Sequence, residues 1–144
     1  PVAPAPRQPV PAAAPPAADA RSRQRACLVV DDSRVIRMVV RRILEAMGLA
    51  VEEAADGHAA LLACRAWRPD LVVLDWNMPG LDGSTILAEL RAMPGHDTLP
   101  VIVCSSDTDV ASIARALDAG ASEYVMKPFD ADILHGKLAQ LGIF

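Results

Sequence analysis

The strongest constraint on the fold of this chain is a short apolar run that ends in an acid, within the stretch LVVLDWNMPGLDG (71–83). Residues 71–74 show no polar alternation, which is typical of a strand buried on both faces of a parallel sheet. Asp75 follows directly, so we expect it at the carboxyl edge of that sheet, where open α/β folds place their sites. There, the carboxylate could cap a helix, bind a metal or act as a nucleophile.

Strand-like and helix-like segments alternate from Cys27 onward. Strands are predicted over residues 27–32, 49–55, 71–75, 99–106 and 122–127, with the second at an edge of the sheet. Helices are predicted over residues 35–47, 58–67, 84–93 and 131–141, and from a cap at Asp107 or Thr108 through Ala119. Ser33 and Gly48 suit the two ends of the first helix. Such alternation with short connections predicts a five-stranded parallel sheet with helices on both faces.

The N-terminal segment differs from the rest. Residues 1–26 hold seven of the twelve prolines, with four arginines against one aspartate. Such a segment buries too little apolar surface to offset its ordering entropy, so we predict a disordered linker, with the folded domain over residues 27–144. The acidic remainder argues against direct nucleic-acid binding.

Targeting signals and membrane spans are not evident. No apolar run approaches the roughly 20 residues that span a bilayer, and the N-terminus lacks a signal-peptide pattern. We therefore expect a cytoplasmic protein. The three cysteines, Cys27, Cys64 and Cys104, have no zinc-binding spacing, and we expect them to be small buried hydrophobes in a reducing compartment.

Conspicuous polar residues follow four of the predicted strands. They are Asp31 and Asp32, Asp75, Ser105 and Ser106, and Lys127. Because the carboxyl ends of parallel strands share one edge, these distant residues should converge on one pocket.

The chemistry of this set favours phosphoryl transfer. Three neighbouring carboxylates repel one another, and Mg²⁺ relieves that repulsion with hard oxygen ligands. The ammonium of Lys127 and the hydroxyl of Ser105 would neutralise and position phosphoryl oxygens. Asp75 would then be the acceptor that forms an aspartyl phosphate.

Four stretches together resemble the receiver domain of two-component response regulators, most closely the single-domain chemotaxis type. They are VVDDS (29–33), LDWNMPGLDG (74–83), PVIVCSS (100–106) and GASEYVMKPF (120–129). The resemblance covers residues 27–144. It implies a flavodoxin-like, doubly wound sheet with strand order 2-1-3-4-5 and five helices.

The resemblance also implies roles for individual residues. Asp75 would be the phosphoacceptor, and Asp31, Asp32, Asp75 and the backbone carbonyl of Asn77 would hold Mg²⁺. Ser105, the backbone of Ser106 and Lys127 would bind the phosphoryl group. Ser105 and Tyr124 would form the switch. Residues that would tune the site from nearby are Trp76, Asn77 and Asp107.

A sensor histidine kinase or phosphotransfer protein would supply the phosphoryl group. The signal would pass to a downstream protein on the face of the fourth helix, fifth strand and fifth helix. We expect a stand-alone regulator that catalyses only its own phosphorylation and dephosphorylation. The alternatives are the terminal receiver of a hybrid histidine kinase, a receiver kept only as a docking module, and a haloacid-dehalogenase-like phosphatase. Asn77 stands where such phosphatases carry a second aspartate, which disfavours the last alternative.

Several residues also have structural interpretations. Asp32 could cap the first helix. Gly57 and Gly83 are predicted at turns or caps, Trp76 is predicted to be exposed, and His58, His96 and His135 are expected at the surface.

Overall fold

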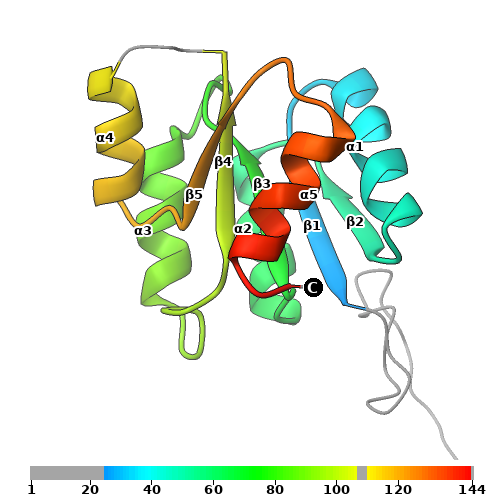
Figure 1. Ribbon diagram of the computed structural model, residues 1–144. Helices are drawn as coiled ribbons and strands as arrows, with labels where there is room; N and C mark the ends of the chain where they lie inside the picture. The colour runs from blue at the N-terminus through cyan, green and yellow to red at the C-terminus, as the bar shows by residue number, and fades with distance from the viewer. Residues whose placement is uncertain (1–24, 107–109, 144) are drawn as a thin grey trace, which may run out of the picture.

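A computed structural model describes residues 25–106 and 110–143 of the chain (Figure 1). The strands are β1 (Ala26–Val30), β2 (Ala50–Ala54), β3 (Leu71–Asp75), β4 (Val101–Ser105) and β5 (Glu123–Met126). The helices are α1 (Arg34–Ala46), α2 (Gly57–Ala66), α3 (Gly83–Ala92), α4 (Val110–Asp118) and α5 (Ala131–Gln140). The predicted linker lies outside the described residues except for its last two, and so do the predicted caps Asp107 and Thr108.

All five strands form one parallel sheet in the order β2-β1-β3-β4-β5, which confirms the predicted fold and the edge position of β2. The register aligns the strand ends that carry the site. Val30 pairs with Leu74, Asp75 with Cys104, and Ser105 with Met126. The residues that follow these strands therefore emerge in one row along the carboxyl edge.

Helices lie on both faces of the sheet, as Figure 1 shows, and an apolar layer lies between the sheet and the helices on each face. Leu28 and Val30 of β1 point to the layer with α2, α3 and α4, whereas Cys27 and Val29 point to the layer with α1 and α5. The same alternation occurs in β3, so residues 71–74 are all buried although they face opposite sides. Burial of one large aliphatic side chain stabilises the fold by about 1.5–3 kcal/mol. Because every residue of β1, β3 and β4 is buried, these three strands contribute to the stability of both layers.

Four helices begin at a polar cap. The Ser33 hydroxyl accepts a hydrogen bond from the Ile36 N–H at the start of α1. The corresponding caps of α2, α3 and α5 are Asp56, Asp82 and Asp130. Because Ser33 occupies the cap of α1, Asp32 is not needed there, and its interpretation as a cap is wrong.

His96 is buried, 7% exposed, which corrects its prediction as a surface residue. The chain turns after α3 at Gly95, which is exposed and has a positive φ of 81°. The guanidinium of Arg91 then donates to the carbonyls of His96 and Leu99 at 3.0 and 2.5 Å, which draws this turn against the protein. The contact spans a turn without regular periodicity, so the apolar pattern of the sequence did not reveal it.

The three cysteines are free and buried, as predicted. Burial raises the pKa of Cys64 to about 11 and that of Cys104 to about 12, and it raises the pKa of Cys27 as well. Cys64 lies in the layer with α2, whereas Cys27 and Cys104 lie in the layer with α1 and α5. No helix in the described part of the chain is long and apolar enough to cross a membrane.

Gly57 and Gly83 are the first residues of α2 and α3, one position beyond the caps, and both are buried. The indole ring of Trp76 lies directly against the Cα of Gly83, so any added Cβ would overlap the ring. Gly83 therefore permits a close contact between the residue after β3 and the start of α3. Gly136, inside α5, has nothing within 4 Å of the position of a Cβ.

These two glycines predict opposite effects of the same substitution. Gly83→Ala should lower the free energy of unfolding by roughly 1–3 kcal/mol, because the methyl group must displace Trp76. Gly136→Ala should raise it by about 0.4–1 kcal/mol, because alanine restricts the unfolded chain and meets no obstacle. Urea unfolding measures both. Equal effects of the two substitutions would contradict the close contact at Gly83.

Candidate functional site

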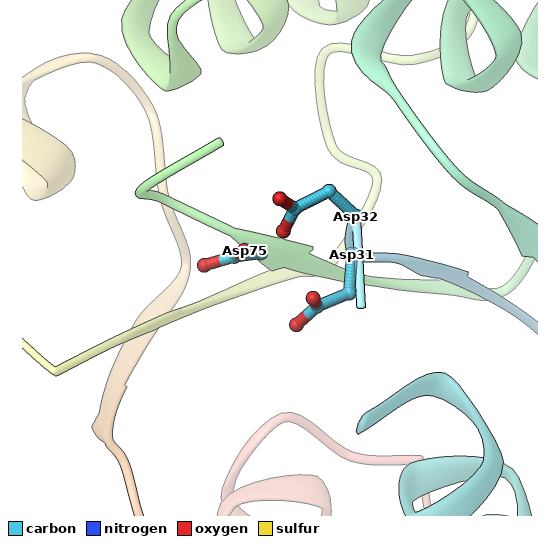
Figure 2. Close-up of side chains that lie close together, drawn as sticks. All are labelled: Asp31, Asp32 and Asp75. Carbon is cyan, nitrogen blue, oxygen red and sulfur yellow. The ribbon is translucent and has the colours of Figure 1, made fainter. Parts of the chain in front are cut away.

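Three carboxylates converge at the carboxyl edge of the sheet. Asp31, Asp32 and Asp75 each offer one oxygen, and these atoms lie within 4.8 Å of one another. Figure 2 shows the Asp31 and Asp32 carboxylates on either side of Asp75. Asp31 and Asp75 are each only 4% exposed, whereas Asp32 is exposed. The sequence prediction that the acids after β1 and β3 meet is therefore confirmed.

Lys127 joins two of these acids from the residue after β5. Its Nζ atom lies 3.0 Å from Asp31 Oδ2 and 3.2 Å from Asp75 Oδ1. Burial alone would lower the pKa of Lys127, but its hydrogen bond to Asp31 and the charges of both acids raise it above the usual value. The ammonium is therefore the resident counter-charge of the cluster.

Asp75 remains electrostatically strained despite this contact. Burial raises its pKa above the usual value, and the charge of Asp31 raises it further. The charge of Lys127 and the Asn77 N–H, which donates to Asp75 Oδ1 at 3.2 Å, oppose the shift without cancelling it. A cation bound at this position would therefore stabilise the ionised Asp75 carboxylate.

The turn after β1 is fixed by backbone and side-chain donors. The Ser33 N–H donates to Asp31 Oδ1 at 2.9 Å, so Ser33 supports the site as well as capping α1. The Arg37 guanidinium donates to the Asp31 carbonyl at 2.7 Å. No motif in the sequence indicated this role of Arg37. The position of Arg37 one helical turn after the cap Ser33 was the available signal, but this position alone does not say which acceptor the side chain reaches.

Ser105 lies at the end of β4, beside the acids. Its hydroxyl donates to Oδ1 of Asn77, two residues after Asp75. Ser106 follows and is exposed. Tyr124 lies half-buried on β5 and pairs with Val103 of β4. Ser105 and Lys127 are therefore brought to the cluster, whereas Tyr124 lies farther down the neighbouring strand. Asp107 lies outside the described residues.

Trp76 is half-buried and packs against the layer with α2, α3 and α4, which corrects the prediction that it is exposed. The correction has a specific cause, because Gly83 leaves space for the indole ring. The ring borders a cavity of about 230 Å³ that Asn77, Asp82, Ser84 and Arg115 also line. Trp76, the residue next to Asp75, therefore connects the site to the start of α3 by direct contact.

The donor set fits Mg²⁺. Three carboxylates supply hard oxygen ligands, and one ammonium leaves the cluster with excess negative charge. Mg²⁺ prefers a few carboxylates together with carbonyl oxygen and water, whereas zinc sites favour thiolate and imidazole. The residues that could hold the ion are Asp31, Asp32 and Asp75.

Comparison with known proteins agrees with this arrangement. The family model described as "Response regulator receiver domain" matches residues 27–139. The response regulator MprA of Mycolicibacterium vanbaalenii is 42% identical over 114 residues, covering 79% of this chain and 48% of that protein. The chain thus spans about half the length of the curated relatives it matches.

Solved structures show the same fold. The chemotaxis protein CheY4 of Vibrio cholerae is 30% identical with a TM-score of 0.78, covering 82% of this chain and 98% of that one. The receiver domain of a sensor histidine kinase from Pseudomonas aeruginosa is 28% identical with a TM-score of 0.77, covering 83% and 98%. That structure has a magnesium ion coordinated in its active-site cleft.

The strain on Asp75 predicts a stability effect with a defined pH dependence. Without metal, Asp75→Asn should raise the free energy of unfolding at neutral pH, because the variant carries no buried charge there. The folded-state pKa of Asp75 lies above its unfolded value of about 3.9. Ionisation therefore costs stability as the pH rises through the folded-state pKa, and the advantage of the variant should shrink as the pH falls toward about 3.9.

Denaturant unfolding in the presence of EDTA, repeated across this pH range, measures the difference. Asp56→Asn is the matched control, since Asp56 is an exposed cap of α2 and lies outside the cluster. A variant at Asp75 that is less stable than the parent at neutral pH would contradict the strain.

Proposed function

The chain belongs to the response regulator receiver domain family, and on that premise we propose that it is a phosphorylation-controlled switch with Asp75 as the phosphoacceptor. One observation carries the proposal: the buried Asp75 carboxylate lies at the sheet edge within reach of two further acids and the Lys127 ammonium. No other described cluster of acids could hold a metal in this way. The donor would be a sensor histidine kinase or a phosphotransfer protein.

The chemistry follows from the charges. An Asp75 oxygen attacks the phosphorus of a phosphohistidine and forms an O–P bond as the P–N bond breaks, and the imidazole nitrogen leaves with the P–N electron pair and takes up a proton. Bound Mg²⁺ would neutralise phosphoryl oxygens at Asp31, Asp32 and Asp75. Lys127 now contacts Asp75, and its flexible four-carbon stem would allow the ammonium to turn to the incoming phosphoryl oxygens. Burial limits competing water at the acceptor.

Ser105 and Tyr124 would report the modification. The Ser105 hydroxyl now donates to Asn77 and must leave that partner to donate to a phosphoryl oxygen. Ser105 and Tyr124 lie on paired strands, and Tyr124 lines a groove of about 700 Å³ between α4 and α5. Movement at Ser105 could therefore change the space available to the tyrosine ring.

The same groove supports an output face for a downstream protein. Leu117 of α4, Met126 of β5 and Ile133 of α5 line it and are 46%, 46% and 47% exposed. Exposed apolar side chains gathered around a groove are typical of protein-binding surfaces. Lys137 and Glu123 form an ion pair at its border, at 2.9 Å, which adds a polar rim.

Two of the similar structures support the alternative that this domain is part of a hybrid histidine kinase. The Pseudomonas neighbour is part of a sensor histidine kinase, and so is a receiver of Syntrophus aciditrophicus that is 30% identical. This chain could likewise be the receiver of a hybrid kinase. The sequence that flanks it in the full-length protein distinguishes this placement from a separate regulator.

Labelling with acetyl phosphate tests the acceptor. In the presence of Mg²⁺ the protein should gain one phosphoryl group, measured by intact mass, because acetyl phosphate can replace the phosphohistidine donor. Asp75→Asn should gain none, whereas Asp56→Asn should be labelled like the parent. Equal labelling of Asp75→Asn would assign the acceptor elsewhere.

The same preparation distinguishes a switch from a phosphatase. With p-nitrophenyl phosphate the protein should give no multiple turnover, because Asn77 cannot donate and recover a proton as a second aspartate would. Sustained turnover that depends on Asp75 would favour the phosphatase alternative.

Fluorine NMR tests the switch. The chain has one tyrosine, so fluorotyrosine incorporation reports position 124 alone. Adding Mg²⁺ with beryllofluoride, which mimics the phosphoryl group, should shift the resonance because the ring changes its surroundings. The shift should be absent in Asp75→Asn. A resonance that stays unchanged in the parent would exclude Tyr124 from the response.

A further inference from the structure

Asp32 is the least restrained of the three acids. It is exposed, and no side-chain hydrogen bond holds its carboxylate within residues 25–106 and 110–143. Asp31 and Asp75, in contrast, each accept hydrogen bonds from Lys127 and from a backbone N–H. The direction of the Asp32 side chain therefore depends on how its backbone is held.

Arg37 holds that backbone from α1. Its side chain is only 14% exposed, and its Nη1 atom donates to the Asp31 carbonyl at 2.7 Å. The Asp31 carbonyl and the Asp32 N–H belong to one planar peptide unit, so fixing the carbonyl also fixes the plane from which Asp32 departs. The backbone N–H of Asp31 also has a partner, because it donates to the Ala54 carbonyl of β2 at 3.2 Å.

The guanidinium is itself anchored. Its Nε atom donates to Glu53 Oε1 at 2.9 Å, and Arg41 Nε donates to Glu53 Oε2 at 2.6 Å. Glu53 lies on β2, so α1, β2 and the turn after β1 are tied through one arginine. The guanidinium holds the carbonyl and the carboxylate through two different nitrogens of one rigid plane, a geometry that the single nitrogen of a lysine does not reproduce.

We propose that Arg37 is a positioning residue for the metal site: by holding the Asp31 carbonyl it orients Asp32 toward the cation. This inference rests on the proposed function, since it assumes that the acid cluster binds Mg²⁺. Groups that orient metal ligands commonly change metal affinity by roughly 10–100-fold when they are removed.

Charge and positioning predict opposite outcomes. If Arg37 acted only as a nearby cation, its removal would strengthen Mg²⁺ binding, because less positive charge would face the ion. If it positions Asp32, removal weakens binding. Arg41→Gln is the matched control, since Arg41 also pairs with Glu53 but has no contact with Asp31.

The test is a Mg²⁺ titration followed by tryptophan fluorescence and by the rise in Tm, with the free energy of unfolding measured separately in EDTA. Arg37→Gln should bind Mg²⁺ roughly tenfold more weakly than the parent. Asp32→Asn, which removes the carboxylate itself, gives the loss of affinity with which this effect is compared. Arg41→Gln should bind like the parent. Arg37→Lys, which keeps the charge without the fork, should fall between Arg37→Gln and the parent.

The outcomes separate the inference from the proposed function. Unchanged or tighter binding by Arg37→Gln, at whatever stability, overturns the positioning role. Equal weakening in Arg41→Gln also overturns it, because the effect would then follow the ion pairs with Glu53. If Arg37→Gln does not fold, Arg37→Lys provides the test. An affinity of Arg37→Lys for Mg²⁺ equal to that of the parent overturns the positioning role. A parent protein that shows no saturable Mg²⁺ response would instead contradict the proposed metal site.

Discussion

The ammonium of Lys127 makes the shared edge of the sheet possible. Two like charges about 4 Å apart repel by about 4 kcal/mol at an effective dielectric constant of 20, a large share of the 5–15 kcal/mol that stabilises a typical domain. Three carboxylates within 4.8 Å would therefore strain the fold unless a cation stood among them. By contacting Asp31 and Asp75, Lys127 also ties the ends of β1, β3 and β5 to one point.

This arrangement supports the proposed response of the site to a phosphoryl group. One cation balances the buried acids only in part, as the raised pKa of Asp75 indicates. Lys127 holds Asp75, and Ser105 holds Asn77, through side-chain hydrogen bonds that the proposed switch would exchange for phosphoryl oxygens. The Ser33 N–H donates to the Asp31 carboxylate and the Arg37 guanidinium donates to the Asp31 carbonyl, and these two contacts hold the turn after β1 in place. The site thus combines contacts that fix the turn after β1 with contacts that the proposed switch would exchange.

Most of the fold and much of the site could be predicted from sequence. The apolar runs set β1, β3 and β4, and parallel pairing then placed Asp31, Asp75 and Lys127 at one edge. The strand order came from a family resemblance, because periodicity alone does not specify neighbours. Trp76, His96 and Arg37 escaped prediction for one shared reason. Their environments depend on contacts with Gly83, Arg91 and the Asp31 carbonyl, which lie only a few residues away but across turns whose geometry the apolar periodicity does not specify.

The buried cysteines make the two layers of the protein separately observable. A thiol must become a thiolate and meet solvent before it reacts, and burial with a raised pKa opposes both steps. Alkylation in native buffer would therefore proceed through local opening. Cys64 would report opening around α2, whereas Cys27 and Cys104 would report opening beneath α1 and α5. The rates of modification at these thiols would show which layer loosens first when the acid cluster changes its charge.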